Sequence, residues 1–405
     1  MDFDMPADDD PRRLEVRAWL RDNPNPTGRQ LAEAGYVAPH WPKPYGLGAS
    51  PIHQLIIDDE LRAANVKGPQ NAIGIGWAGP TILAGGTPEQ HERYLMKILS
   101  GEEFWCQLFS EPDSGSDLAG LSTRAIRDGD TYVVNGSKIW TSGGHHAKFG
   151  ILIARTNPDA AKHRGISYFV CPMDLPGIEL QPIIDMTTAH SFNQVFFTDV
   201  RLPADCLIGA ENDGWRLAKV TLGNERVSLS GSGSLWGTGP SAYDLIHAVK
   251  ASKAIIEPAF REQLASLYIE AEVLRLMRLR TLTAAVRGRE PGAEASVQKL
   301  LADEHGQHVM AAAKAFVGAH GMLSGSGPVG LLEDSGAPTE VNFKPGQYRD
   351  VDPIWHYGFL FSPALTIGGG TWAVQRNIVA ERALGLPHDV DVEKGKTWSE
   401  NRQRA

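Results

Sequence analysis

Ser110-Glu-Pro-Asp-Ser-Gly-Ser-Asp117 and Asn135-Gly-Ser-Lys-Ile-Trp-Thr-Ser142 are the two stretches that decide the fold of this chain. Each joins a strand-like run to a turn with small hydroxyl side chains, and the second also carries a large aromatic residue, Trp140. Hydroxyls and backbone N–H groups can hydrogen-bond the edge of a flat heterocycle, and an indole offers a face for such a ring. Ser, Gly, Asp and Pro also make ordinary turns, so either stretch alone is equally consistent with a plain turn in a β-domain. The pair predicts a surface that holds a flavin.

Short runs rich in β-branched and aromatic residues surround these stretches, and helical periodicity precedes and follows them. The expected strands are Thr131–Val134, Phe149–Ala154, Ile166–Val170 and Phe192–Phe197. The expected helices are Arg12–Asp22, Arg29–Gly35, Pro51–Ala64, Ile73–Leu83, Pro88–Ser100, Gly214–Ser230, Pro258–Arg287, Ala293–Gly318 and Thr371–Leu384.

This order of elements predicts an α+β multidomain fold. We expect an N-terminal helical domain over residues 1–103, a middle β-barrel or sandwich domain over 104–212 and a C-terminal helical bundle over 213–405. A Gly- and Pro-rich insert from Ser324 to Pro353 is expected to be a surface excursion.

Bulk composition limits the classes of protein to consider. The chain has 405 residues, of which 42% are hydrophobic and 21% charged, enough for two or three packed cores. The net charge of −9 argues against a general nucleic-acid binder, which would need a basic surface for phosphates. No apolar run approaches the length of a membrane span.

Cysteines, histidines and the first residues complete this picture. Three cysteines (Cys106, Cys171 and Cys206) fit a reducing compartment and are expected to be small buried hydrophobes. The acidic opening lacks the basic residues of a signal peptide or presequence, so we expect a cytoplasmic protein. No metal site is expected, because His145-His146 and the separate His305 and His308 lack a cluster of ligands.

The motifs, taken in order, resemble those of the acyl-CoA dehydrogenase family over nearly the whole chain. The matching segments are the two stretches above, Val200-Arg-Leu-Pro203, Asn224-Glu-Arg226, Gly369-Gly-Thr371 and Gln375-Arg-Asn-Ile378. The resemblance implies that FAD lies between the β-domain and the C-terminal bundle, with an acyl-CoA thioester between the flavin and a catalytic carboxylate. It also implies dimers of dimers and transfer of electrons to an electron-transfer flavoprotein.

The resemblance assigns cofactor binding to Phe109, Ser110, Ser116, Trp140, Ser142 and Thr371. Phe109 and Ser110 would meet the flavin through backbone and hydroxyl contacts, and Ser142 would hydrogen-bond near N5, the atom that receives hydride. Ser116 would contact cofactor phosphate or substrate. Trp140 would flank the ring, although a core tryptophan between sheets is the ordinary alternative.

The resemblance also selects Glu225 as the catalytic base. Many members place the catalytic Glu just before the Gly-Thr pair, but here that position is Gly369, which has no side chain. A minority place it on the first long helix of the C-terminal domain, before an Arg, as in Glu225-Arg226. The Gly369 N–H would then polarise the thioester carbonyl, and Arg226 would lie beside the substrate. The alternative for Glu225 is a surface carboxylate paired with Arg226 or with a helix neighbour.

Departures from the family pattern gather at the adenosine end of FAD. Lys250-Ala-Ser-Lys-Ala-Ile-Ile256 stands where Arg-x-x-Phe-Gly is usual, and Ala315 and Ala373 replace polar residues. Arg261 or Lys314 are the candidate substitutes. These losses favour one alternative to a self-sufficient dehydrogenase, a non-catalytic or half-site subunit of a heterotetramer. A second alternative is a flavin oxygenase on the same fold, against which the carboxylate of Glu225 argues. Small residues at Gly223, Gly231, Gly233 and Gly368 suggest room for branched or ring-bearing acyl groups.

Overall fold

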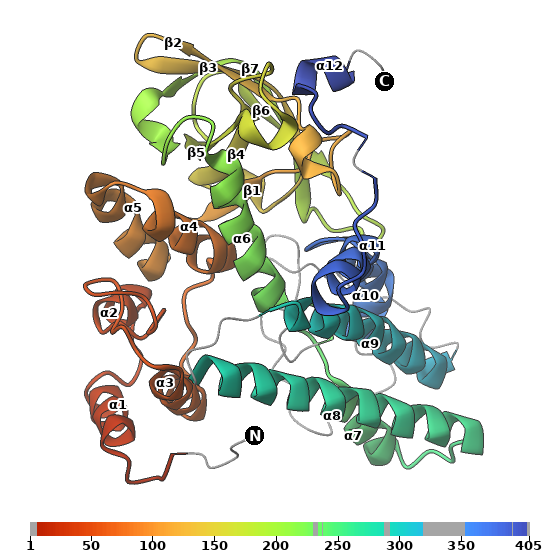
Figure 1. The fold of residues 1–405 in the computed structure, drawn as a ribbon. Helices are drawn as coiled ribbons and strands as arrows, with labels where there is room; N and C mark the ends of the chain where they lie inside the picture. The colour runs from red at the N-terminus through yellow and green to blue at the C-terminus, as the bar shows by residue number, and fades with distance from the viewer. Residues whose placement is uncertain are drawn as a thin grey trace.

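A computed structural model describes residues 6–229, 234–236, 238–286, 292–318, 353–390 and 392–402, with only the backbone given for 226–229, 282, 285–286 and 353. The expected insert from Ser324 lies outside the described residues except at its last position. Helices near the N-terminus lie beside a β-sheet, and a second group of helices follows the sheet in sequence (Figure 1).

Local capping signals set the N-terminal helices. They are α1 (Pro11–Asp22), α2 (Gly28–Glu33), α3 (Pro51–Ala63), α4 (Gly79–Gly85) and α5 (Pro88–Ser100), with a π-helical turn over Gly74–Ala78 before α4. In α5 the Thr87 side chain accepts from the N–H of Gln90, whose own side chain accepts from the N–H of Thr87. This reciprocal cap, Pro88 in the first turn and Gly101 in the left-handed region (φ 76°) fix both ends at the predicted residues.

The middle of the chain forms one hydrogen-bonded sheet in the order β6-β7-β3-β2-β4-β5-β8, with β1 paired to β4. The strands are β1 (Trp105–Leu108), β2 (Arg124–Asp128), β3 (Thr131–Ser142), β4 (Phe149–Arg155), β5 (Ile166–Pro172), β6 (Ile178–Ile183), β7 (Phe192–Pro203) and β8 (Leu207–Ile208). The β2–β4 junction has one paired position, Arg124 opposite Arg155, so the two halves of the sheet are joined only narrowly.

A shared hydrophobic core lies between these halves. Val134 and Val195 from β3 and β7 belong to the same buried cluster as Leu152 and Phe169 from β4 and β5. Two half-sheets around one core form a sandwich, as expected from the sequence. The same cluster contains all three cysteines, which are free and buried.

Strand β3 runs from Thr131 to Ser142, much further than the predicted Thr131–Val134. Gly136 allows this extension because its φ of 145° and its close approach to Thr123, 2.5 Å from an added Cβ to Oγ1, exclude a side chain. The register shifts again between Lys138 and Thr141, where Trp140 has a φ of 59°. The second decisive stretch is therefore a strand with two irregularities.

The C-terminal helices are α6 (Gly214–Leu229), α7 (Ala242–Ser252), α8 (Pro258–Val286), α9 (Glu294–Val317), α10 (Pro353–Phe361), α11 (Trp372–Ile378) and α12 (Trp398–Arg402). Helix α6 runs from the sheet toward α9 and packs against α4 and β5 (Figure 1). The chain then returns to the sheet, where α12 lies beside the strands. Helix α6 thus touches all three groups.

A buried hydroxyl cluster fixes α6 at this junction. Thr221 Oγ1 lies 2.8 Å from Thr81 Oγ1 of α4 and 3.0 Å from the Tyr168 hydroxyl of β5. Thr81 also donates to the Trp77 carbonyl at 2.8 Å. Because Thr81, Tyr168 and Thr221 are all fully buried, these bonds form in a low-dielectric interior and hold the three elements in one register.

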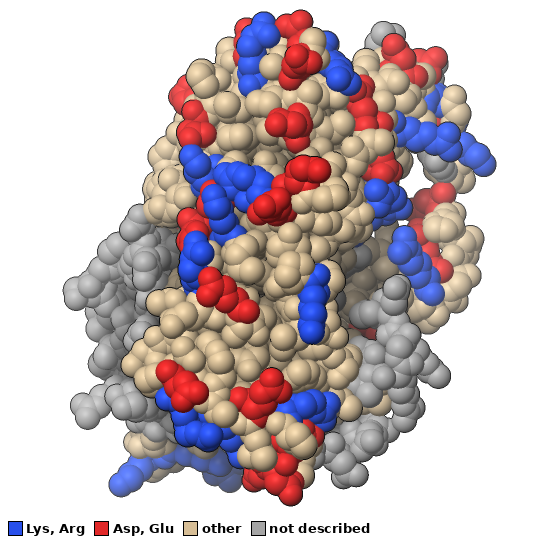
Figure 2. Space-filling model, turned by 90° about the vertical axis from the view of Figure 1, so that its left-hand side faces the viewer, with Lys and Arg blue, Asp and Glu red and all other residues tan. Residues whose placement is uncertain are grey.

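Charges of both signs are interspersed on the molecular face in Figure 2, which covers the N-terminal helices and part of the sheet. Neither sign forms a continuous area across that face. Within the described ranges, no helix has both the length and the apolarity needed to cross a membrane.

Candidate active site

A buried ion pair joins the two decisive stretches. Lys138 is fully buried, and its Nζ donates to the Phe109 carbonyl at 3.0 Å and to Glu111 Oε1 at 2.9 Å. Burial would raise the pKa of Glu111, but Lys138 and the backbone N–H groups of Ser122 and Thr123 outweigh that effect and lower it. The carboxylate therefore stays ionised and fixes the loop after Ser110.

The backbone completes this connection, because the N–H of Ile139 donates to the Ser110 carbonyl at 2.9 Å. The next residue, Trp140, is 57% exposed, and its ring contact among the described residues is the edge of Phe192, with the ring centroids 5.9 Å apart. The core-tryptophan alternative is therefore excluded. Phe192 packs in turn against the core of the C-terminal helices, so the Trp140 turn lies where the sheet meets the bundle.

Ser116 and Thr371, far apart in sequence, come together across that boundary. Their hydroxyl oxygens are 3.5 Å apart. Thr371 caps α11 by accepting from the N–H of Val374, so its position is set by the helix. Phe109, by contrast, is a core side chain packed edge-on to Tyr168, and only its backbone is available for the role implied by the resemblance.

The glycine turn before Thr371 is held from beneath by Gln375. Gly369 and Gly370 have φ values of 67° and 89°, which favour glycine. The Gln375 side chain is fully buried, and its Nε2 donates to the carbonyls of Gly369 and Gly370 at 3.2 and 3.4 Å. The sequence showed Gln375 as part of a motif but gave no sign of this contact.

Glu225 is buried on α6, with only 8% of its surface exposed. Gln107 of β1 donates from Nε2 to Glu225 Oε2 at 3.4 Å. This burial is at odds with a surface carboxylate, and the side chain of Arg226 lies outside the described residues. Gln107 was not predicted, although a polar residue in the buried strand Trp105–Leu108 was an available signal.

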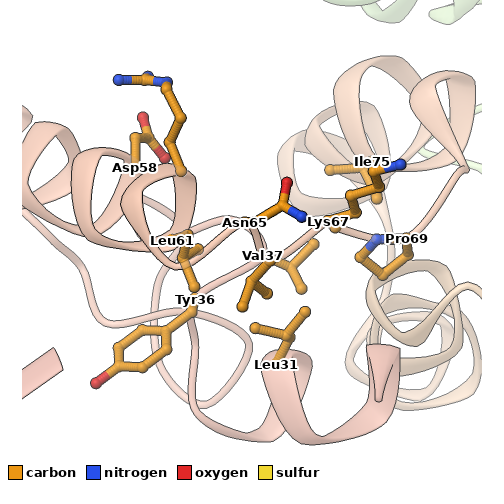
Figure 3. Close-up of a pocket in the computed structure, with 12 residues that line it drawn as sticks. Leu31, Tyr36, Val37, Asp58, Leu61, Asn65, Lys67, Pro69 and Ile75 are labelled. Carbon is orange, nitrogen blue, oxygen red and sulfur yellow. The ribbon is translucent and has the colours of Figure 1, made fainter. Parts of the chain in front are cut away.

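A pocket of 490 Å³ lies elsewhere, among the N-terminal helices (Figure 3). Leu31, Val37 and Leu61 form an apolar wall, and burial raises the pKa of Asp58 to about 6. None of the predicted site residues lines this pocket. Among the described residues, no group of three or more His, Cys, Asp or Glu side chains is placed to hold a metal ion.

Family models match the chain in three consecutive parts. They are the N-terminal, middle and C-terminal domains of acyl-CoA dehydrogenase, over residues 10–102, 106–200 and 212–384 respectively.

Curated relatives show the same similarity. The chain is 42% identical over 357 residues to acyl-CoA dehydrogenase FadE34 of Mycobacterium tuberculosis, covering 88% of this chain but only 45% of that relative. It is 35% identical over 377 residues to acyl-CoA dehydrogenase IpdE1 of the same organism, covering 93% of this chain and 89% of the relative.

Two solved structures resemble the fold across almost the full chain. One is described as the Tcur3481-Tcur3483 steroid ACAD, with a TM-score of 0.74 and 29% identity over 96% of this chain and 100% of that one. The other is the ChsE4-ChsE5 complex from M. tuberculosis, with the same TM-score, identity and coverage.

Proposed function

Because this chain belongs to the acyl-CoA dehydrogenase family, we propose that it is an FAD-dependent enzyme that desaturates an acyl-CoA thioester between Cα and Cβ. Glu225 removes the α-proton, and the electrons pass on to an electron-transfer flavoprotein. The observation that carries the proposal is the buried carboxylate of Glu225, placed on the helix that joins the three parts of the molecule.

The contacts around Glu225 suit a general base. A base must be held in a defined position and protected from bulk water. Gln107 donates a hydrogen bond to one carboxylate oxygen, and Thr221, one helical turn earlier, fixes the position of α6 along α4. The C–H electron pair of the α-carbon then forms the double bond as the proton passes to Glu225 and the β-carbon gives up a hydride, for which bound FAD would be the acceptor. The Gly369 N–H is proposed to donate to the thioester oxygen as its charge develops.

The flavin end of the site has side chains that fit FAD. An isoalloxazine ring needs an aromatic face and hydrogen-bonding groups at its edge, and Trp140 and Ser142 lie two residues apart on an irregular strand. The exposed Trp140 indole, at a backbone conformation rare for such a residue, is the observation that supports the fit. Bound FAD would supply the hydride acceptor.

The adenosine end fits less well within one chain. In the segment that replaces Arg-x-x-Phe-Gly, Ile255 is fully exposed. Of the candidate substitutes, Arg261 is exposed on α8, and Lys314 is hydrogen-bonded to His356 at 2.7 Å. We therefore propose that a second subunit completes this end. Both structural neighbours are named for two different proteins, Tcur3481-Tcur3483 and ChsE4-ChsE5, which favours a paralogous partner over a second copy.

A ring-bearing acyl group is the substrate class we propose, since a neighbour is described as a steroid ACAD. Gly223 on α6, near Glu225, has no atom of the described residues within 4 Å of an added Cβ. Gly368 does not add to this space, contrary to the expectation from sequence, because ring carbons of Trp236 lie 2.5 and 2.9 Å from the Cβ position. Gly231 and Gly233 lie outside the described residues.

Anaerobic bleaching of bound flavin tests the proposed function directly. The chain, purified with whichever subunit it needs to hold FAD, is mixed with a panel of straight, branched and steroid-derived acyl-CoA thioesters. We expect bleaching, fastest with the ring-bearing thioesters. A chain that binds FAD but is reduced by no acyl-CoA would contradict the activity, and a preference for straight chains would contradict only the substrate class.

Expression alone, followed by native mass measurement and flavin counting, tests the partner. We expect a chain that retains little FAD until a paralogous subunit is co-expressed. A homotetramer with one FAD per chain would contradict the need for a paralogue.

A further inference from the structure

Three imidazole rings lie behind the Trp140–Ser142 turn. His145 stacks on His190 with ring centroids 4.1 Å apart and an angle of 18° between the planes, and His146 lies 3.9 Å away on a tilted plane. His145 and His146 belong to the helical turn Gly144–His146, which directly follows the strand. The sequence indicated only an adjacent His pair, and His190 joins it from the segment before β7.

Asn193 connects these rings to the turn. It is 1% exposed and lies opposite Thr141 in the β3–β7 ladder. Its Nδ2 lies 3.1 Å from the Thr141 carbonyl oxygen and 3.1 Å from His145 Nδ1, while its Oδ1 lies 2.8 Å from His190 Nε2. Because a carbonyl only accepts, Nδ2 must donate to it. His145 Nδ1 is then an acceptor and His190 Nε2 a donor.

The turn needs such a connection because its strand pairing is interrupted. Between Lys138 and Thr141 the ladder shifts register, and Trp140 has a φ of 59°. A bulge leaves its extra residue without a partner across the ladder. Asn193 supplies an additional side-chain bond at Thr141, the first residue paired again after the interruption, and the N–H of Gly143 donates to the Ser191 carbonyl at 3.1 Å just beyond it.

Glycine at position 144 leaves space for the Asn193 amide. A Cβ added to Gly144 would lie 3.0 Å from Thr141 Cγ2 and 3.3 Å from Asn193 Nδ2. These distances are tighter than ordinary van der Waals contacts, so a side chain at position 144 would press on the amide.

We propose that Asn193 is a positioning residue for the flavin-binding turn and that His145 and His190 set the orientation of its amide. The inference rests on the proposed function, since FAD is the ligand of the turn. Asn193 acts through Thr141: by fixing the Thr141 carbonyl, it fixes the backbone between Trp140 and Ser142 and with it the directions of these two side chains.

Four variants test this role in the chain expressed with whichever subunit it needs for FAD binding. Asn193→Ala removes the amide, and Asn193→Asp keeps its shape but cannot donate to the Thr141 carbonyl. His190→Phe keeps a stacked ring without the donor, whereas His190→Gln retains a donor. The readouts are the Kd for FAD, the absorption spectrum of the bound flavin and the rise in Tm caused by FAD.

Both Asn193 variants are expected to raise the Kd for FAD about tenfold, as for the loss of one well-placed hydrogen bond. They should also shift the flavin spectrum and reduce the FAD-dependent rise in Tm. We expect His190→Phe to act in the same direction and His190→Gln to restore most of the affinity.

Unchanged FAD affinity and flavin spectrum in both Asn193 variants would overturn the inference. If these variants have a lower Tm as apo proteins but bind FAD as the wild type does, Asn193 has only a structural role, and the inference is likewise overturned. If Asn193→Ala does not fold, equal FAD affinity in the two His190 variants would overturn it. Trp140→Ala separates FAD binding by the turn from the positioning of the turn by Asn193. A wild-type protein that binds no FAD contradicts the proposed function, whereas binding that depends on Trp140 but not on Asn193 contradicts only the positioning role.

Discussion

Trp140 combines high exposure with a left-handed backbone conformation. The indole gains little burial in the isolated chain that could compensate for this backbone conformation. Among the described residues its ring contact is the edge of Phe192. A non-glycine residue in the left-handed region costs about 1–2 kcal/mol relative to the right-handed region. The residue is therefore placed for a contact outside the chain, and we assign that contact to the flavin.

A comparison of Trp140→Gly with Trp140→Ala separates backbone strain from the loss of the indole. Both variants should lose FAD affinity, because both remove the aromatic face. The apo form of the Gly variant should be more stable than that of the Ala variant by about 1 kcal/mol, since glycine adopts φ near 60° without strain. Chemical denaturation of the two apo proteins measures this difference. Equal stabilities would show that φ at this position is not strained.

Candidate site residues within one sequence segment could be proposed from the sequence. Residues that act through a partner far away in the sequence could not. Trp140 and Ser142 follow from the composition of one strand and its turn. Gln107 and Asn193 could not be assigned, because their partners lie 118 and 52 residues away in the sequence and are set by helix placement and strand register.

At the scale of elements, helix α6 holds Glu225, the proposed base, and the position of this helix depends on the Thr81–Thr221–Tyr168 cluster. We expect Thr221→Val to lower the free energy of unfolding by about 1–3 kcal/mol, because two buried hydroxyls lose a partner. It should also slow flavin reduction by displacing Glu225.

Thr283→Val on α8 is the matched control, because the Thr283 hydroxyl bonds only within its own helix, to Leu279, in the contacts that the structure describes. Urea unfolding and anaerobic bleaching provide the two measurements. Equal effects of the two substitutions would contradict the role of Thr221 as an anchor between elements.

The elements themselves show where sequence reasoning succeeds. Helix α5 was predicted at both ends because its caps are local. Strands β2 (Arg124–Asp128) and β6 (Ile178–Ile183) were missed, since most of their residues are not buried and their pairing with β3 and β7 creates them. Helix α7 (Ala242–Ser252) was also missed, although its Ser241–Asp244 capping box was a readable signal.

At the scale of the molecule, the C-terminal residues hold the loop that contains Ser116. Lys162 bridges Asp117 of that loop and Glu393 of the tail, at 2.7 Å in each case. The Trp398 indole covers Arg155, 4.9 Å from its guanidinium carbon, and donates to the Gly120 carbonyl. Burial lowers the pKa of Arg155 to about 10, and Arg155 itself donates to the carbonyls of Ala119 and Leu121.

Trp398→Ala should therefore destabilise the loop as well as the tail. The expected cost is about 1–3 kcal/mol from the lost ring contact and hydrogen bond, with faster amide exchange over residues 117–122. Lys148→Ala, which breaks an exposed pair with Asp174, is the control and should change stability by less than about 0.5 kcal/mol. Hydrogen exchange and denaturant unfolding measure the difference between the Trp398→Ala and Lys148→Ala variants. Loss of stability without faster exchange in the loop would contradict the connection.

The three-part order of helices, sheet and helices was readable from the periodicity of the sequence. The return of the tail to the sheet was not, because it depends on contacts such as that between Trp398 and Gly120, 278 residues apart. The same limit applies to the adenosine end of the cofactor, which we expect a second subunit to complete.

The most direct test of the central claim is the rate at which an acyl-CoA reduces bound flavin in Glu225→Gln under anaerobic conditions. The acyl-CoA is the one that reduces the wild type fastest, and both proteins are matched for FAD content and flavin spectrum. We predict that the variant retains FAD but loses about 3 or more orders of magnitude in the rate of reduction, because the amide cannot accept the α-proton. A variant that reduces its flavin at nearly the wild-type rate would contradict the assignment of Glu225 as the base.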